Sequence, residues 1–191
     1  MFFKNAHCLV TDHGAALQND ADKAEYLRLV EKAKKDFGLK LPAYALLPGR
    51  ALLYFVTPGA DLHSVMGGLG RDKTLPGYAV GSCKYKLIQP DKYSAALARF
   101  IHSEPVKAGL AAKAEDYKWS SAAQYLGTAE GPADKDIVLG QFAGSPAEAL
   151  AKYAEFMAED VPGKFWRPFD KNRDAVLGDR DFVTAHSPHN G

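Results

Sequence analysis

The chain has 191 residues, 47% of them hydrophobic, with 24 lysines and arginines against 23 aspartates and glutamates, a formal net charge of +1. This length favours one domain around one core, and the sequence lacks an apolar run near the roughly 20 residues that cross a bilayer. A protein that neutralises many phosphates is usually clearly basic, so any nucleic-acid surface here must be a local patch. We therefore expect a soluble, cytoplasmic protein with no membrane partner.

The first 38 residues predict a strand followed by a helix. Residues 6–11, AHCLVT, have a strand-like composition and precede a turn. From Asn19 or Asp20, either of which is a suitable cap, apolar residues recur at helical spacing until Gly38, a residue suited to end a helix.

The stretch from Ala43 to Pro58, AYALLPGRALLYFVTP, predicts two strands joined by a tight turn. Pro48-Gly49 is a turn-forming pair, and residues 51–56 are apolar enough to form a central strand. The element order to this point is strand, helix, strand, strand.

The remainder predicts one further strand and several helices. In chain order we expect a short helix from Asp61, a loop over residues 71–82, a strand at 83–88 and a helix from Pro90. A connection bracketed by Pro105 and Gly109 should follow, then a helical turn that ends at Gly127, and then a helix from Ser145-Pro146 to about Glu159.

This order fits an α+β fold of the ferredoxin-like sandwich kind, with one antiparallel sheet and helices on one face. We expect residues 1–127 to form this domain. Residues 128–191 are expected to form a helical C-terminal extension that packs on the same domain, because the tail carries aromatic residues.

Residues 99–127, RFIHSEPVKAGLAAKAEDYKWSSAAQYLG, resemble a family signature. They look like R-Y-I-x-x-N-P-V-R-A-G-L, followed by D-Y-x-W-S-S and L-G, of the REP-associated tyrosine transposases. These are relatives of the single-tyrosine insertion-sequence transposases in the HUH superfamily. Residues 8–14, 85–86 and 176–183 resemble other segments of the family in the same order, so the resemblance covers most of the chain.

The resemblance implies cutting and rejoining of single-stranded DNA at hairpin-bearing ends. In such chemistry two histidines at i and i+2 hold a divalent metal, and a tyrosine attacks the phosphorus. The family pattern over the hairpin is A-Y-x-L-M-P-N-H-x-H-L-L, and here Arg50 and Leu52 stand where the two histidines belong. Neither side chain can ligate a metal, so we expect no metal and no other cofactor.

The attacking tyrosine also has no clear counterpart. We expect the family's tyrosine just after a segment like residues 65–70, and Lys73 and Thr74 occupy that neighbourhood. Tyr78 is a weak candidate in a predicted loop, and ordinary packing or surface exposure is the favoured interpretation. We therefore expect a degenerate family member that is not an enzyme.

The favoured hypothesis is a catalytically inactive, transposase-like protein that binds structured, hairpin single-stranded DNA or RNA in a domesticated or regulatory role. Arg50 could bind a phosphate bidentately, or be only a surface residue at a turn. Trp119 could stack on a base, although a core position is favoured. The candidate nucleic-acid-binding residues are Arg50, Lys84, Lys86, Lys107, Lys118 and Trp119.

Two alternatives remain open. One is a protein-interaction or assembly module that has lost nucleic-acid binding and has a protein partner, which the near-zero net charge and the alanine-rich helices favour. The other, least favoured, is an active transposase with an unrecognised site. The sequence leaves a monomer and a homodimer equally open.

Overall fold

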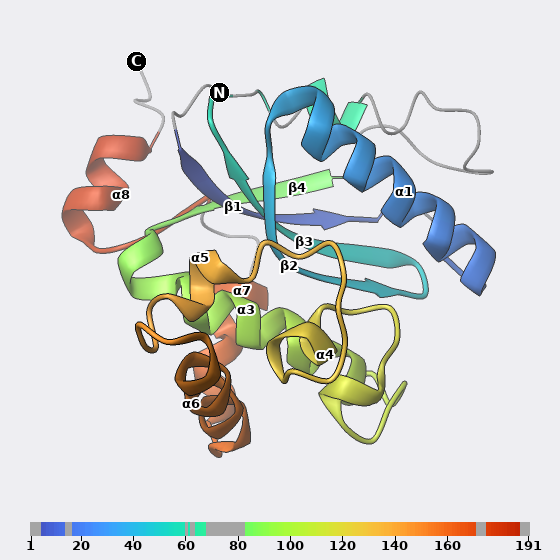
Figure 1. Cartoon of the computed structure of the whole chain (residues 1–191). Helices are drawn as coiled ribbons and strands as arrows, with labels where there is room; N and C mark the ends of the chain where they lie inside the picture. The colour runs from blue at the N-terminus through green and yellow to red at the C-terminus, as the bar shows by residue number, and fades with distance from the viewer. Residues whose placement is uncertain are drawn as a thin grey trace.

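A computed structural model describes residues 5–13, 17–59, 61, 64–67, 83–170 and 175–187. It consists of a five-stranded sheet between two helical layers (Figure 1). The strands are β1 (Ala6–Asp12), β2 (Lys40–Leu47), β3 (Arg50–Thr57), β4 (Cys83–Ile88) and β5 (Val176–Leu177). The helices are α1 (Asp20–Phe37), α3 (Pro90–Lys107), α4 (Ala122–Tyr125), α5 (Asp136–Leu139), α6 (Pro146–Ala158), α7 (Arg167–Asp170) and α8 (Arg180–His186), with 3-10 turns η1 (Ala114–Asp116) and η2 (Gly163–Trp166). Residues 64–67 are also helical.

The strand order is β2-β3-β1-β4-β5. The first four strands pair antiparallel in the order expected of a ferredoxin-like sheet, and the α+β class is confirmed. The sheet is mixed rather than wholly antiparallel, because β5 pairs parallel to β4. The amides of Leu87 and Gln89 donate to the carbonyls of Ala175 and Leu177, each at 2.8 Å, so the tail of the chain extends the sheet.

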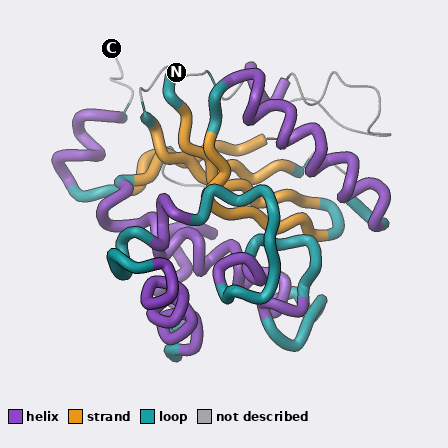
Figure 2. The backbone as a smooth tube through the Cα atoms, in the orientation of Figure 1, coloured by secondary structure: helices purple, strands orange, loops and turns teal. Residues whose placement is uncertain are grey.

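Helices cover both faces of the sheet, not one (Figures 1 and 2). The first core contains α1 and the 64–67 turn, as a ferredoxin-like fold requires. The second core contains α3, α5, α6 and α7, which bury the opposite face. The signal for this lies in β2 and β3, whose near-continuous apolar runs are typical of strands buried on both faces. The boundary expected at residue 127 stays a prediction.

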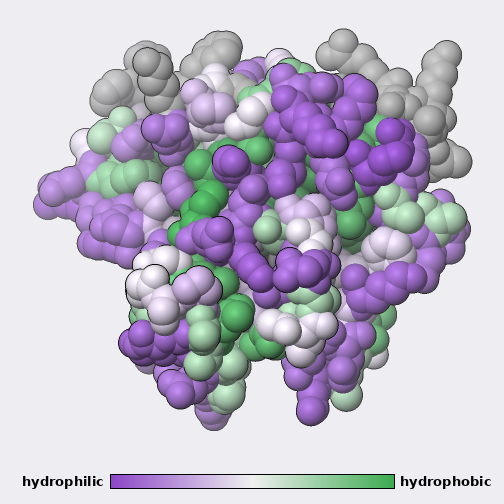
Figure 3. Space-filling view, viewed as in Figure 1, coloured by the Kyte–Doolittle hydropathy of each residue, from purple (hydrophilic) through white to green (hydrophobic). Residues whose placement is uncertain are grey.

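The first helix begins and ends as its sequence predicts. Asn19 is the N-cap, and its side chain accepts a hydrogen bond from the amide of Asp22 at 2.9 Å. Gly38 has a φ of 65°, and its amide donates to the carbonyl of Lys34, which closes the last turn. The outer surface over α1 is largely hydrophilic (Figure 3), so the helix is amphipathic.

The β2–β3 hairpin turns at Pro48 and Gly49, with Leu47 opposite Arg50. Gly49 has a φ of 75°, and a proline followed by a residue with positive φ is the pattern of a type II turn. This turn fixes the register, and therefore fixes which side chains of β3 point to each face.

The outer edge of β2 is covered by the segment from Tyr117 to Asp134. The amide of Leu46 donates to the carbonyl of Trp119, and the amide of Ser121 donates to the carbonyl of Tyr44. Near the start of the strand, the amide of Leu41 donates to the Asp134 carboxylate at 2.6 Å. This segment therefore occupies backbone groups that an edge strand otherwise leaves open.

Pro105 lies within α3, which continues to Lys107, so the expected break before it is wrong. Pro105 has no amide hydrogen to donate, so α3 continues past it with one helical hydrogen bond fewer. Among the described residues, no helix combines the length and the apolar character needed to span a bilayer.

Candidate functional site

Residues 50 and 52 point toward α3. Leu52 is 2% exposed and belongs to the core that α3 forms with the sheet, together with Phe100. Ala51 and Leu53 belong to the opposite core. Because side chains alternate along a strand, Arg50 lies on the α3 side with Leu52. The two positions at which the resemblance places metal ligands thus lie beneath one helix.

Arg50 is bound to an acid of the same chain. Its Nη2 donates to Oε2 of Glu104 on α3, and Nζ of Lys107 lies 3.1 Å from Oε1 of the same carboxylate. The Glu104 side chain is 7% exposed and that of Arg50 is 34% exposed. Lys107 also lies over the Trp166 ring, 4.1 Å from its centroid. A phosphate at Arg50 or Lys107 must therefore compete with Glu104.

The helical turn at residues 64–67 does not face this site. Val65 and Met66 belong to the core on the opposite side of the sheet from Leu52. The helix that faces residues 50 and 52 is α3, and the family pattern over α3, R-Y-I, has its tyrosine at the position of Phe100. Sequence reasoning did not single out Phe100, although the signal was present in the quoted motif. Lys73 and Thr74 lie outside the described residues, so the expectation placed on that neighbourhood stays a prediction.

Lys118 and Trp119 meet at the first turn of α1. The Trp119 indole Nε1 donates to Oδ1 of Asp20 at 2.6 Å, and the Lys118 ammonium donates to Oδ2 at 2.9 Å. These two hydrogen bonds, that from Lys118 first, lower the pKa of Asp20. Trp119 is partly buried against the first core, and Lys118 lies over its ring at 4.7 Å. The pair links α1 to the segment that covers β2.

Lys84 and Lys86 share a strand but have different environments. They are expected to project together from one sheet face, and alternate residues of β4 do share a face. Lys84 is exposed, whereas Lys86 is 7% exposed and its Nζ donates to the carbonyl of Pro168. The structure therefore places Lys84 at the surface and Lys86 in the interior, beneath α7.

No family model and no curated protein matches the chain. A solved structure of a REP-associated tyrosine transposase bound to a REP hairpin matches it with a TM-score of 0.55, over 76% of this chain and 89% of that one.

The chain shares its fold with that transposase. The sequences are 16% identical over this match, so the likeness concerns the fold.

Tyr78 lies outside the described residues. Within the described parts of the chain, histidine, cysteine, aspartate and glutamate side chains form no group of three that is arranged to hold a metal ion. Arg50 and Leu52 occupy the two expected ligand positions, as the sequence already shows.

A buried network on the side of the sheet that α3 covers has the composition of a nucleophile and its base. Nε2 of His102 lies 2.8 Å from Oγ of Ser121, and Nδ1 lies 2.7 Å from the Tyr153 hydroxyl. All three residues are 0% exposed, and burial lowers the pKa of His102 to about 3. Ser121 Oγ also accepts from the amide of Tyr44 at 2.9 Å. Because its side chains are fully buried, this network joins α3, α6 and β2 in the interior.

Proposed function

We propose that this protein is a catalytically inactive, transposase-like protein that binds structured, hairpin single-stranded DNA or RNA. The observation that carries the proposal is the α3-facing side of β3 in a transposase fold. There, Arg50, Leu52 and Phe100 occupy the positions that the family pattern gives to two histidines and a tyrosine.

Each of these replacements removes one chemical requirement. A guanidinium has no lone pair for a metal, a leucine has no donor atom, and a phenylalanine has no oxygen to attack phosphorus. The Arg50–Glu104 ion pair fills the same place with a cation and an anion that neutralise each other. The residues at all three positions are therefore consistent with a loss of strand cleavage.

Nucleic-acid binding is supported by the fold and by one exposed lysine. The neighbouring structure holds a REP hairpin, and Lys84 is exposed on β4. The overall charge of +1 predicts a small number of phosphate contacts. The binding affinity should therefore decrease only gradually as the salt concentration rises.

The first test measures fluorescence anisotropy of labelled DNA and RNA hairpins at low salt. We expect binding that weakens as salt rises, and a further loss of affinity for Lys84→Glu. The matched control is Lys35→Glu, which changes the same charge near the exposed end of α1, on the other face of the sheet. An absence of binding to every hairpin at low salt would remove the nucleic-acid proposal.

The second test addresses catalysis. Labelled hairpin DNA is incubated with the protein and Mg²⁺ or Mn²⁺, and covalent adducts are sought on a denaturing gel. We expect none. A phosphotyrosine adduct at Tyr78, or at any other tyrosine, would show that the protein is an enzyme.

A second candidate function is a protein-interaction or assembly module. The observation that favours it is that five of the six candidate nucleic-acid-binding residues have partners within the chain; the sixth is Lys84. Arg50 and Lys107 bind Glu104, Lys118 and Trp119 bind Asp20, and Lys86 binds the carbonyl of Pro168. The absence of hairpin binding in the first test would favour this function.

A further inference from the structure

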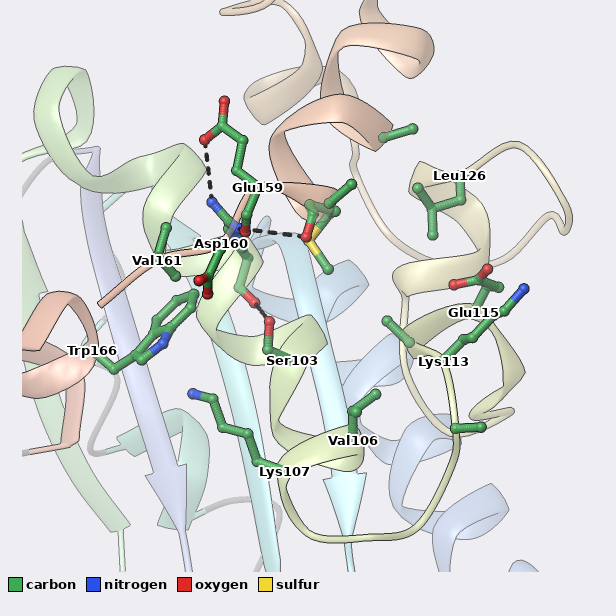
Figure 4. Close-up of a pocket in the computed structure, with 16 residues that line it drawn as sticks. Ser103, Val106, Lys107, Lys113, Glu115, Leu126, Glu159, Asp160, Val161 and Trp166 are labelled. Carbon is green, nitrogen blue, oxygen red and sulfur yellow. Dashed lines mark hydrogen bonds and ion pairs between the residues drawn. The ribbon is translucent and has the colours of Figure 1, made fainter. Parts of the chain in front are cut away.

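A cavity of about 530 Å³ lies between the C-terminal half of α3 and the C-terminal end of α6, on the far side of α3 from the sheet. Figure 4 shows Glu159, Asp160 and Val161 along one side of it, with Lys113, Glu115 and Leu126 opposite. It is separate from the face of β3 that carries Leu52.

The base of this cavity is a buried arginine with unused hydrogen-bonding capacity. Arg99 is 2% exposed, and its Nη2 donates to the carbonyls of Met157 and Glu159. Its Nη1 is buried and has no hydrogen-bond partner; Oε2 of Glu159 stands 3.6 Å away. A buried, charged N–H without an acceptor is uncommon in folded proteins, because an unsatisfied buried donor is costly. A ligand atom that accepts a hydrogen bond from Nη1 would remove that cost.

Glu159 is placed to act as a displaceable occupant. Its side chain is 63% exposed, so the carboxylate can turn into solvent at little cost. The carboxylate does not reach hydrogen-bonding distance of Arg99 Nη1. It therefore offsets the positive charge of the arginine but accepts no hydrogen bond from Nη1. An acid oxygen that enters from the cavity can do both.

The rest of the lining selects a ligand with one charge and an apolar body. Three cations and three acids line the cavity, so the lining is neutral, and it has an excess of one positive charge when Glu159 turns outward. The charged residues are Arg99, Lys107, Lys113, Glu115, Glu159 and Asp160. The apolar lining residues include Val106, Leu126, Met157, Val161 and Trp166.

We propose that this cavity binds a small organic acid with a single negative charge and an aliphatic or aromatic body. Its carboxylate accepts a hydrogen bond from Arg99 Nη1 in place of the Glu159 carboxylate, and its body lies against the apolar lining. Bidentate or charge-assisted recognition of a carboxylate by a buried guanidinium is among the stronger polar contacts in proteins. The proposal is independent of nucleic-acid binding.

The probe is octanoate, with octanol as the uncharged match of equal length, and calorimetric titration of the full chain measures both. We expect octanoate to bind with one-to-one stoichiometry and about tenfold more tightly than octanol. Glu159→Gln, which removes the competing carboxylate, should tighten octanoate binding several-fold. Glu148→Gln is the matched control, because it removes an acid in the first turn of α6, outside the cavity, and should leave the affinity unchanged.

Two further variants keep the outcome decisive. Ala154→Trp introduces a bulky ring at the cavity lining and should abolish binding, and Arg99→Gln should remove the preference for octanoate over octanol. If Arg99→Gln fails to fold, Glu159→Gln and Ala154→Trp still decide the question. Equal affinity for octanoate and octanol, or an unchanged affinity in Glu159→Gln, would overturn the proposal. Displacement of octanoate by a short single-stranded oligonucleotide would reassign the cavity to nucleic acid and overturn it as well.

Discussion

The guanidinium of Arg50 and the carboxylate of Glu104 form an ion pair between two residues that are 54 positions apart in the sequence. Glu104 stands where the family pattern has asparagine, and Arg50 stands where it has a histidine. The two residues that depart from the family pattern are therefore in contact. Each is partly withdrawn from water, and each provides the opposite charge that the other requires there.

This pairing predicts a measurable coupling. Arg50→Met should lower the free energy of unfolding by about 1–2 kcal/mol, because Glu104 is left in the interior with Lys107 as its remaining cation. The double variant Arg50→Met/Glu104→Gln should lose less than the sum of the two single variants when urea unfolding is measured. Arg28→Met, which breaks an exposed pair with Glu25, serves as the control and should change stability by less than about 0.5 kcal/mol. Strict additivity of the two single changes would contradict the coupling.

Lys84 and Lys86 should respond in opposite ways to the same substitution. Lys86→Met leaves the carbonyl of Pro168 without its donor, and should cost about 1 kcal/mol of stability while hairpin affinity is kept. Lys84→Met removes an exposed charge, and should weaken hairpin binding at low salt while stability is kept. Urea unfolding and anisotropy on both variants check this, and a loss of affinity in Lys86→Met at unchanged stability would contradict the assignment.

Acid sensitivity should be traceable to His102. Burial holds the pKa of His102 at about 3, whereas an unfolded histidine titrates near 6.5. Between these values the unfolded chain binds a proton that the folded chain does not, so the free energy of unfolding falls as pH falls through this window. At pH 4.5 the loss is about 2–3 kcal/mol.

The variant His102→Gln isolates this contribution, because an amide keeps a donor and an acceptor but does not titrate in the window. Unfolding curves at pH 7.5 first establish how much stability the substitution itself costs. The difference between wild type and variant should then shrink as pH falls from 6.5 toward 3. A constant difference across that range would show that His102 binds its proton equally in the folded and the unfolded chain, and would contradict the prediction.

Asp134 should stabilise the edge of the sheet. Its carboxylate accepts from the Leu41 amide and pairs with Lys34 at 2.8 Å. Asp134→Ala should lower the free energy of unfolding by about 1–2 kcal/mol, because the Leu41 amide then loses its acceptor. Hydrogen exchange at Leu41 should accelerate in the variant, whereas exchange at Leu53, within the central strand β3, should follow the global change alone.

The sequence predicted those elements that local patterns determine. The caps of α1, the Pro48-Gly49 turn and the strand at residues 83–88 all depend on residues close together in the chain. The break expected at Pro105 was wrong, because α3 continues through this residue and tertiary packing offsets the intrinsic cost of a proline.

The candidate site was less predictable, because it depends on partners distant in sequence. The pairs Arg50–Glu104 and Asp20–Trp119 join residues 54 and 99 positions apart, and no periodicity signals such contacts. The burial of Lys86 likewise depends on α7, more than 80 residues later. A basic residue on a strand can be identified from sequence, but whether it meets solvent or a carbonyl is decided by the layer that covers it.

The segment from Tyr117 to Asp134, which covers the outer edge of β2, also affects how copies of this chain can associate. A second copy that added a strand there would first have to detach the segment that contains Ser121 and Asp134, and with it the buried contact of Ser121 to His102. Opening this edge therefore disturbs the helical core as well as the sheet. Self-association through continuous sheet extension at β2 is opposed from within the monomer.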